Sequence, residues 1–234
     1  MIRVAVIRFP GSNCEPDAFR AVARAGGAPF YLFHRDSDLR DADAVILPGG
    51  FSYGDYLRAG AIARFSPIMA AIERHAADGR PVLGICNGFQ ILCESGLLPG
   101  ALERNAGLKY LSRPVDVRIE RIDTPFTSGY RQGEVIRIPI GHGDGRFSAS
   151  LETLAELEAN RQVVLRYAAG MTDAPANPNG ALNDIAAIAN REGNVVGMMP
   201  HPERLADPLL GSEAGSRVFT SLVHWTRPTL VTNA

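Results

Sequence analysis

The sequence predicts an α/β fold with a mostly parallel, mixed central sheet and helices on both faces of that sheet. Over roughly the first hundred residues, short apolar runs rich in β-branched residues alternate with amphipathic helical patterns. Such alternation is typical of successive β-α-β units, whose strands pair in parallel. In the second half, runs with a period of two indicate antiparallel strands that extend the same sheet. At about 150 residues per domain, the length of 234 residues allows one large domain or two small ones, and we favour a single domain over 1–234.

The first half supplies the parallel strands and the helices that connect them. Strands are predicted at 2–7, 30–33, Ala44–Leu47 and 81–85, and helices at 16–25, 61–77 and Asn87–Glu94. Gly26 and Gly79 end the first two helices, because glycine readily takes the left-handed conformation found after a helix C-terminus. The second helix is expected to bury one face, made of Ile62, Phe65, Met69, Ile72 and Ala76.

The second half changes in character. The runs 115–120 and 135–140 alternate like antiparallel strands. The runs 185–190 and 195–199 form another close pair, joined by a short polar turn. The last element is a helix at 213–225, whose buried face is expected to hold Val218, Phe219, Leu222 and Val223.

Composition and charge exclude several classes of protein. Lys and Arg number 24 against 25 Asp and Glu, so the net charge of −1 gives no electrostatic attraction to nucleic acid or to an acidic membrane surface. No run of about 18 apolar residues predicts a membrane span, and we expect a cytoplasmic protein. Cys14, Cys86 and Cys93 include no CxxC pair, which indicates neither a disulfide framework nor a metal site.

A thiol at a strand–helix junction is the strongest chemical feature of the sequence. Gly84-Ile85-Cys86-Asn87-Gly88 places Cys86 where a buried strand meets a helix, as in a nucleophile elbow. An elbow strains its central residue and brings neighbouring turns together, so flanking glycines remove Cβ atoms that would clash. The N-terminal end of the helix dipole favours a thiolate there. The alternative is that Cys86 is a small buried hydrophobic residue, as most free cysteines are.

The other two cysteines are weaker candidates for a catalytic role. Cys93 lies two helical turns after Cys86 on the same side, and we expect it in the core. Cys14 follows Gly11-Ser12-Asn13 in a strand–helix loop at the carboxyl edge of the sheet. It either lines the same cleft as Cys86 or is an inert loop residue.

A nucleophilic thiol needs a base, and His201 is the strongest candidate among five histidines. In Met199-Pro200-His201-Pro202-Glu203 the two prolines favour an extended segment, in which residues i and i+2 point to the same side. Glu203 can therefore orient the imidazole of His201 and stabilise its protonated form. The alternative is a surface turn with an incidental His-Pro-Glu.

The remaining histidines are weaker candidates for the base. His34, His75 and His224 lie at a strand end or on helices, where solvated or hydrogen-bonded imidazoles are common. His142 lies in a glycine-rich loop, Gly141-His142-Gly143-Asp144-Gly145, without a recognised spacing.

Acyl transfer from an amide also needs donors for an oxyanion, and one well-placed backbone N–H contributes on the order of 3 kcal/mol. The N–H of Asn87 is the first after the nucleophile, at the start of a helix. The second donor is expected from Gly50 of Pro48-Gly49-Gly50, a bend after the neighbouring strand. The alternative is that this bend is only a structural tight turn.

These motifs, in this order, resemble the class I (triad) glutamine amidotransferases, which have a flavodoxin-like fold. The similarity extends over nearly the whole chain. The blocks 50–60, 84–90, 177–180 and 193–204 resemble the glutaminase subunits of phosphoribosylformylglycinamidine synthases, from de novo purine biosynthesis.

The resemblance implies a reaction and assigns roles to the triad. Cys86 would attack the side-chain amide of L-glutamine, form a glutamyl thioester and release ammonia. His201 would protonate the leaving ammonia and then activate water, and Glu203 would orient His201. By the same resemblance, Gln90 would help to bind glutamine, and Gly50 and Asn87 would be the oxyanion donors.

The resemblance also implies partners. A large synthetase subunit would use the ammonia, with ATP and Mg²⁺, to convert formylglycinamide ribonucleotide to the amidine, and a small subunit would bridge the complex. This chain contains no Gly-Lys dipeptide and hence no Walker A loop. We therefore expect no cofactor or metal in this chain, and low glutaminase activity unless the partner is bound.

Some positions depart from the pattern of that family. Gly107 stands where serine is usual, and Gly141 and Asp144 stand where alanine and glutamate are common. These positions lie outside the triad, so we expect the chemistry to be intact, whereas the details of partner contact stay open.

Two other functions are compatible with parts of the pattern. A stand-alone cysteine hydrolase on a related scaffold would need no partner and no glutamine-specific blocks. A non-catalytic glutamine sensor would have no use for Cys86, His201 and Glu203 together.

Overall fold

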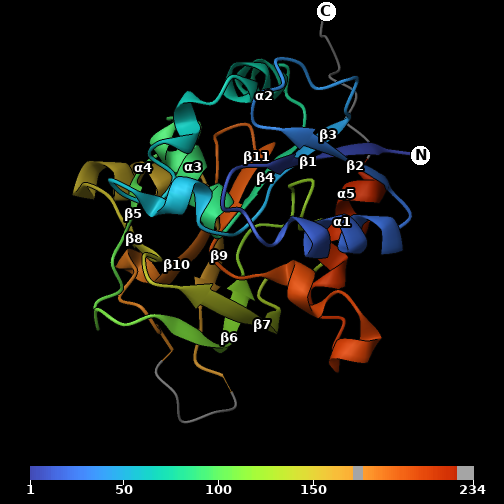
Figure 1. Cartoon of the computed structure of the whole chain (residues 1–234). Coiled ribbons are helices and arrows are strands. Elements are labelled where there is room, and N and C mark those ends of the chain that lie inside the picture. Colours follow the sequence, from blue (N-terminus) through green and yellow to red (C-terminus); the bar gives the residue numbers. More distant parts are fainter. Residues whose placement is uncertain (171–175, 226–234) are drawn as a thin grey trace, which may run out of the picture.

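The computed structural model describes residues 1–170 and 176–225 (Figure 1). Within these residues, a nine-stranded sheet has the order β2-β1-β3-β4-β11-β10-β9-β6-β7, and β5 pairs with β8 apart from it. The strands are β1 (Arg3–Arg8), β2 (Ala28–Phe33), β3 (Ala44–Leu47), β4 (Val82–Ile85), β5 (Ala101–Glu103), β6 (Leu111–Ile119), β7 (Val135–His142), β8 (Arg146–Ser148), β9 (Val163–Tyr167), β10 (Ile185–Ala189) and β11 (Val195–Met198).

The helical elements alternate with the strands. The α-helices are α1 (Glu15–Arg24), α2 (Ile68–Ala77), α3 (Asn87–Glu94), α4 (Leu151–Ala159) and α5 (Ser216–His224). Short 3-10 helices are η1 (Ser52–Asp55), η2 (Ala63–Phe65), η3 (Leu182–Asp184), η4 (Pro202–Leu205) and η5 (Pro208–Leu210).

The sheet is mixed, as the sequence predicts. Strands β2, β1, β3, β4 and β11 run parallel, whereas β10, β9, β6 and β7 continue the sheet in antiparallel pairs. In the parallel part, Leu47 of β3 lies beside Gly84 of β4, and Met198 of β11 lies beside Ile85. The carboxyl ends of these three neighbouring strands therefore meet at one edge, where open α/β sheets bind their ligands.

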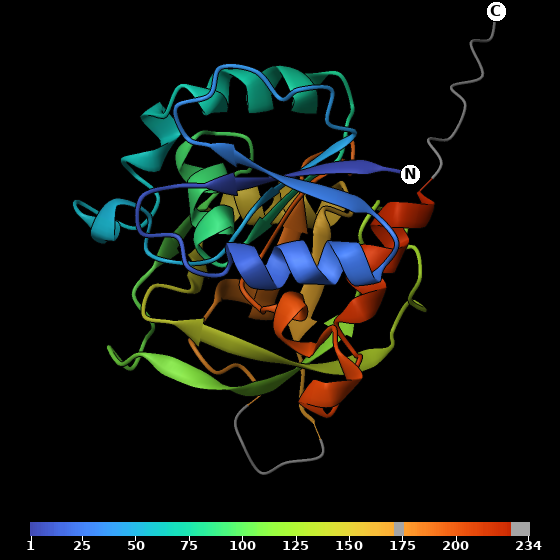
Figure 2. The same ribbon diagram turned by 45° about the vertical axis from the view of Figure 1, so that its right-hand side comes forward.

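Helices cover both faces of the parallel part, which confirms the predicted layers. Helices α1 and α5 lie together on one face, and α2 and α3 lie on the other (Figure 2). Helix α1 packs on β1 and β2, whereas α3 packs on β3, β4 and β11.

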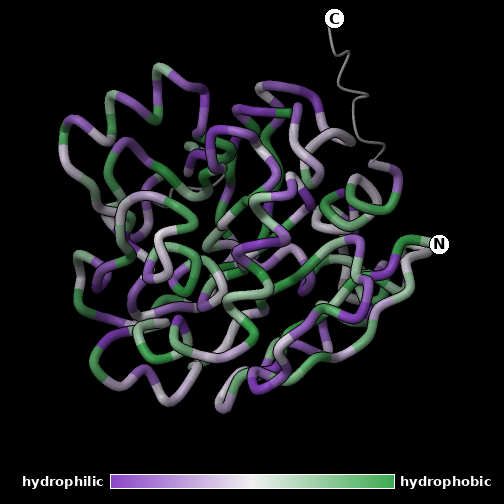
Figure 3. Tube along the Cα trace, turned by 90° about the horizontal axis from the view of Figure 1, so that it is seen from above, coloured by the Kyte–Doolittle hydropathy of each residue, from purple (hydrophilic) through white to green (hydrophobic). Residues whose placement is uncertain are grey.

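The core follows the central strands. Every residue of β3, β4, β10 and β11 is buried, which is typical of strands covered on both faces. In Figure 3, hydrophobic stretches pass through the centre of the molecule. No helix in the described part of the chain has the length and apolar character of a membrane span.

The predicted helix at 61–77 is wrong in its first half. Helix α2 begins only at Ile68, after Pro67. Proline disfavours the helical conformation in the residue before it, and Ser66 is accordingly extended, with ψ of 139°. Phe65 therefore lies outside the helix and is 75% exposed instead of facing the core. Strands β5, β8 and β9 and helix α4 were not predicted from the sequence.

Candidate active site

Cys86 lies in a strained turn between β4 and α3, where the sequence predicts a nucleophile elbow. Its φ of 51° and ψ of −104° lie far from the regions that non-glycine residues favour. The turn is held by the N–H of Cys86, which donates to the carbonyl of Met198 at 2.7 Å. A Cβ on Gly88 would lie 2.0 Å from the carbonyl oxygen of Leu47, so the helix approaches β3 more closely than any other residue allows.

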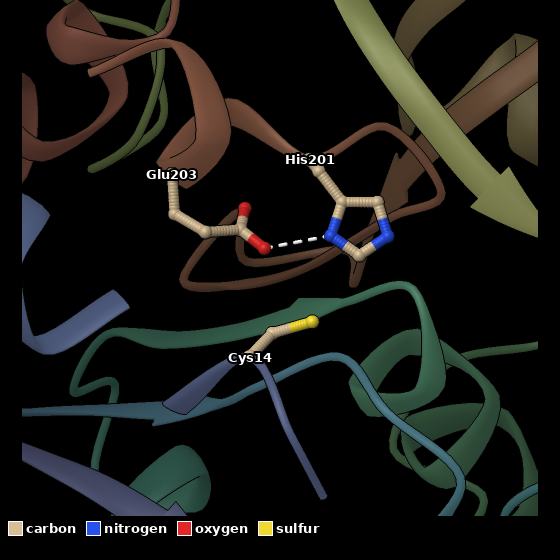
Figure 4. Close-up of side chains that lie close together, drawn as sticks. All are labelled: Cys14, His201 and Glu203. Atoms are coloured by element: carbon tan, nitrogen blue, oxygen red, sulfur yellow. Dashed lines mark hydrogen bonds and ion pairs between the residues drawn. The ribbon is translucent and has the colours of Figure 1, made fainter. Parts of the chain in front are cut away.

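His201 and Glu203 form a buried hydrogen-bonded pair after β11. Nδ1 of His201 lies 2.6 Å from Oε1 of Glu203 (Figure 4), and the two residues are 1% and 4% exposed. The predicted extended segment is wrong, because Pro202 begins the 3-10 helix η4 and Glu203 lies in its first turn. The expected pairing is nevertheless formed.

The charges around His201 favour its protonated form. Burial acts to lower the pKa of this imidazole, but the charges of Glu203 and Cys86 raise the pKa well above its ordinary value. Nε2, the ring nitrogen away from Glu203, is buried. Hydrogen bonding to the sulfurs of Cys14 and Cys86 further raises the pKa of His201, so the imidazole lies within reach of both thiols.

Cys86 and His201 converge on Gly141, which lies in β7. Sγ of Cys86 lies 3.6 Å from the carbonyl oxygen of Gly141. A Cβ on Gly141 would lie 3.9 Å from Nε2 of His201 and 3.2 Å from the hydroxyl of Tyr110. The antiparallel strand β7 thus forms the wall against which the thiol and the imidazole meet.

Cys14 is a second buried thiol beside the same histidine (Figure 4). Ligand atoms of Cys14, His201 and Glu203 lie within 4.8 Å of one another, a spacing that a metal ion can use. The guanidinium of Arg204 donates to Sγ of Cys14 at 3.1 Å, so a positive charge already lies beside the sulfur. This cation and the His201–Glu203 hydrogen bond fit a hydrogen-bonded cluster better than a metal centre.

Cys93 differs from the other two cysteines. It is partly buried and packs against the core, as expected. Burial raises its pKa, which disfavours the thiolate.

A cavity of about 140 Å³ opens beside Cys86. It is lined by Gly50, Phe51, Asp55, Cys86, Gln90, Tyr110, Gly141, His142, Gly143 and Asp144. One water molecule occupies about 10–15 Å³ of such a cavity, so the cavity has room for on the order of ten waters. This size suits a small metabolite.

Of the two predicted oxyanion donors, Gly50 lines this cavity, and Asn87 directly follows Cys86 at the start of α3. The backbone of Gly50 has φ of 145°, and a Cβ there would lie 2.6 Å from Cα of Ser12. Asn87 is 1% exposed, and its Oδ1 accepts from the N–H of Ser52 at 3.0 Å. The side chain of Asn87 thus ties the start of α3 to the loop that follows Gly50.

Gln90 lines the cavity, but its amide is already engaged. Nε2 donates to the carbonyl of Asp144 at 2.5 Å, and Oε1 accepts from Nδ2 of Asn87 at 2.9 Å. These bonds join α3 to the loop after β7, so Gln90 shapes the cavity wall.

His142 lies in the same wall and is 3% exposed. Its Nδ1 lies 3.0 Å from Oδ1 of Asn105, which also accepts the N–H of Gly145, so Nδ1 carries the proton. Burial and the charge of His201 lower the pKa of His142 to about 4. Its Nε2 is therefore a neutral acceptor, and it has no partner among the described residues.

Several residues at the site were not predicted from the sequence to be functional. Asp55 and Tyr110 line the cavity, and Arg204 contacts Cys14. Asp55 lies inside the block 50–60 that carries the family resemblance, and this was the only pointer to it. No spacing rule connects these loops to Cys86.

Comparison with known proteins agrees with this geometry. Residues 1–226 match the model of the CobB/CobQ-like glutamine amidotransferase domain. The chain is 57% identical over 224 residues to the phosphoribosylformylglycinamidine synthase subunit PurQ of Chlorobaculum tepidum, covering 94% of this chain and 96% of that one. It is 54% identical over 222 residues to PurQ of Rubrobacter xylanophilus, covering 95% and 98%.

A solved structure gives the same result. A chain in the structure of PurLQS from Thermotoga maritima superimposes with a TM-score of 0.84 and 45% identity, covering 95% of this chain and 97% of that chain. The chain therefore belongs to the glutamine amidotransferase family that includes the PurQ subunits of phosphoribosylformylglycinamidine synthase.

Proposed function

We propose that this glutamine amidotransferase releases ammonia from L-glutamine with Cys86 as its nucleophile, His201 as its acid and base, and Glu203 as the group that orients His201. The observation that supports this proposal is the convergence of Sγ of Cys86 and Nε2 of His201 on Gly141. Glu203 binds the opposite ring nitrogen. Sulfur, imidazole and carboxylate thus form a chain that ends at the small cavity.

The reaction proceeds through two tetrahedral intermediates. The thiolate of Cys86 adds to the amide carbon of glutamine, and the N–H groups of Gly50 and Asn87 stabilise the oxyanion. The carbon–nitrogen bond then breaks, and His201 transfers its proton from Nε2 to the departing nitrogen, which leaves as ammonia. Neutral His201 next takes a proton from water, which attacks the thioester and yields glutamate and the free thiol.

The preference for Cys86 over Cys14 follows from position. Cys86 lines the cavity and lies at the N-terminus of α3, whereas Cys14 does not line it. Sγ of Cys14 instead lies 3.2 Å from Oδ1 of Asn13 and accepts from Arg204. These contacts suit a buried supporting thiol.

The chain is the glutaminase subunit of phosphoribosylformylglycinamidine synthase in purine biosynthesis. Its ammonia goes to a synthetase subunit, which uses ATP and Mg²⁺ to convert formylglycinamide ribonucleotide to the amidine, and a small subunit bridges the two. The structural relative from a PurLQS complex supports such an assembly.

We also propose that the chain is a single domain and that it acts in the cytoplasm. Residues 1–234 form one domain, supported by a single sheet that joins strands from both halves of the chain. The reaction takes place in the cytoplasm, where the three free thiols stay reduced.

Active-site labelling tests the proposal. A chloroketone analogue of L-glutamine should alkylate Cys86 of the chain bound to its synthetase, and mass spectrometry of peptides should find no label on Cys14. Glutamate release should depend on the synthetase and disappear in Cys86→Ala. Label on Cys14, or full glutaminase activity of Cys86→Ala, contradicts the proposal.

A further inference from the structure

Tyr110 lies on the rim of the cavity beside Cys86, and the mechanism above gives it no role. It lines the cavity and is 55% exposed, so it lies where the reacting groups meet solvent. Tyr110 directly precedes β6, whose first residue, Leu111, pairs with His142 at the end of β7. The tyrosine is therefore placed beside the end of the strand that forms the wall of the site.

Two glycines of this wall allow the tyrosine ring to approach. A Cβ on Gly141 would lie 3.2 Å from the Tyr110 hydroxyl, and a Cβ on Gly143 would lie 3.9 Å from Cδ2 of the ring. A contact of 3.2 Å is tighter than most Cβ contacts, so a side chain at position 141 would push the hydroxyl outward. Without one, the hydroxyl lies against the backbone of β7.

The hydroxyl of Tyr110 lies beside both reacting groups. The Cβ position of Gly141 is 3.9 Å from Nε2 of His201, and the carbonyl oxygen of Gly141 is 3.6 Å from Sγ of Cys86. Burial and the negative charge of Cys86 raise the pKa of Tyr110, whereas the positive charges of His201 and Arg204 act to lower it. The pKa stays above its ordinary value, so the phenol is neutral at physiological pH.

A buried asparagine fixes the segment that carries Tyr110. Asn105 is 1% exposed, and its Nδ2 donates to the carbonyl oxygens of Lys109 and His142, both at 2.9 Å. One side chain thus holds the residue before Tyr110 and the residue after Gly141. Such support sets the geometry of a group before the reaction begins, which is what a catalytic group needs.

Hydrolysis of the thioester has a use for such a group. The hydroxyl of Tyr110 makes no hydrogen bond within the described part of the chain, and a phenol can both donate and accept one. The attacking water gives one proton to Nε2 of His201, and its other O–H needs an acceptor that fixes its orientation. The leaving nitrogen of glutamine has no such need, because a covalent bond holds it until it departs.

We propose that Tyr110 is a further catalytic residue, whose hydroxyl accepts a hydrogen bond from the water that hydrolyses the glutamyl thioester. This proposal rests on the glutaminase function proposed above. One proton of the water passes to Nε2 of His201 while the oxygen forms a bond to the thioester carbon. The carbon–sulfur bond then breaks with its electron pair on Cys86, and the sulfur receives the proton from Nε2. Held by Nε2 and the phenol oxygen, the water directs a lone pair at the carbon.

The test follows the thioester in the chain bound to its synthetase. Tyr110→Phe should lower kcat for glutamate release about tenfold to hundredfold, because the water loses its orientation. KM for L-glutamine should fall as well, since the thioester accumulates when hydrolysis becomes slower than its formation. Acid quenching and mass spectrometry of the intact chain should show more thioester than in wild type.

An added nucleophile gives a second readout. Hydroxylamine is a stronger nucleophile than water and depends less on orientation, so it should intercept the longer-lived thioester. In Tyr110→Phe the ratio of γ-glutamyl hydroxamate to glutamate should rise about tenfold or more over wild type. Gly141→Ala crowds the same hydroxyl from the wall, and its ratio should rise in the same direction.

Controls separate the possible failures. Tyr31→Phe, at an exposed position on the edge strand β2, should show wild-type kinetics. Alkylation of Cys86 by iodoacetamide should proceed at the wild-type rate in Tyr110→Phe. A slower alkylation would mean that Tyr110 acts through the thiol, and it overturns this proposal, as does an unchanged hydroxamate ratio in either variant. A wild-type complex that releases no glutamate from glutamine overturns the proposed function itself.

Discussion

His201 Nδ1 lies 2.6 Å from Glu203 Oε1, and both side chains are buried. Two residues apart in sequence, they reach this distance because Pro202 starts a helical turn directly after His201. The carboxylate orients the imidazole, and the opposite ring nitrogen, Nε2, faces Gly141 of β7.

Replacing this carboxylate by an amide should impair chemistry more than binding. Glu203→Gln keeps the shape but loses the charge that stabilises the imidazolium, so kcat should fall by roughly 10²–10⁴ with little change in KM. Steady-state glutamate release by the synthetase-bound chain measures both constants. Glu73→Gln on the exposed face of α2 is the matched control. A fall confined to KM would contradict the assigned role.

The same pair should make stability depend on pH. The folded-state pKa of His201 is raised well above 6.5, so its contribution is complete below 6.5 and is lost as pH rises through the folded value. Removal of Glu203 lowers that pKa. Melting temperatures should therefore fall less steeply with rising pH in Glu203→Gln than in wild type, and parallel curves would contradict the linkage.

Asp55 should destabilise the free protein near neutral pH. Its folded pKa of about 6 lies above the ordinary 3.8, so the stability conferred by its proton is complete below 3.8 and is lost as pH rises to about 6. After discounting for solvent screening, Asp55→Asn should be about 1–2 kcal/mol more stable than wild type at pH 7.5. The two proteins should converge near pH 4. Urea unfolding at both pH values measures this difference in the free energy of unfolding. An equal difference at both pH values would contradict the raised pKa of Asp55 in the folded protein.

Cys14 should prove to support the site without acting as the nucleophile. Cys14→Ser keeps a small polar group beside Arg204, so glutaminase activity should stay within about tenfold of wild type, whereas Cys86→Ser should lose at least about 10³-fold. Rates of glutamate release for the two variants, side by side, provide the check. The opposite ranking would transfer the nucleophile role to Cys14.

Close packing behind the elbow should tolerate no side chain. Gly88→Ala would place Cβ 2.0 Å from the carbonyl oxygen of Leu47, and we expect a loss of about 3 kcal/mol in the free energy of unfolding. Gly107→Ala is the control, because nothing lies within 4 Å of its added Cβ. Urea denaturation of both variants measures the loss, and equal stabilities would show that α3 can move away from β3.

The sequence by itself determined the parallel strands and the elbow at Cys86, and it predicted the pairing of His201 with Glu203, although these residues meet through a helical turn and not through an extended segment. These features depend on local rules: strand periodicity, glycines at a tight turn, and two side chains two residues apart. Pro67 is a local signal for the start of helix α2 at Ile68. The apolar periodicity of 61–77 outweighed this signal in the prediction, so the predicted helix began too early.

Only the tertiary structure decided how the cavity is assembled. Asp55, Gly141 and Asp144 reach Cys86 because three different loops meet at one edge of the sheet, and their separation in sequence follows no fixed spacing. The second thiol at Cys14 is likewise placed beside His201 by the packing of α1 against η4. Local propensity acts over a few residues, whereas strand order and loop packing set the contacts that distinguish one amidotransferase substrate site from another.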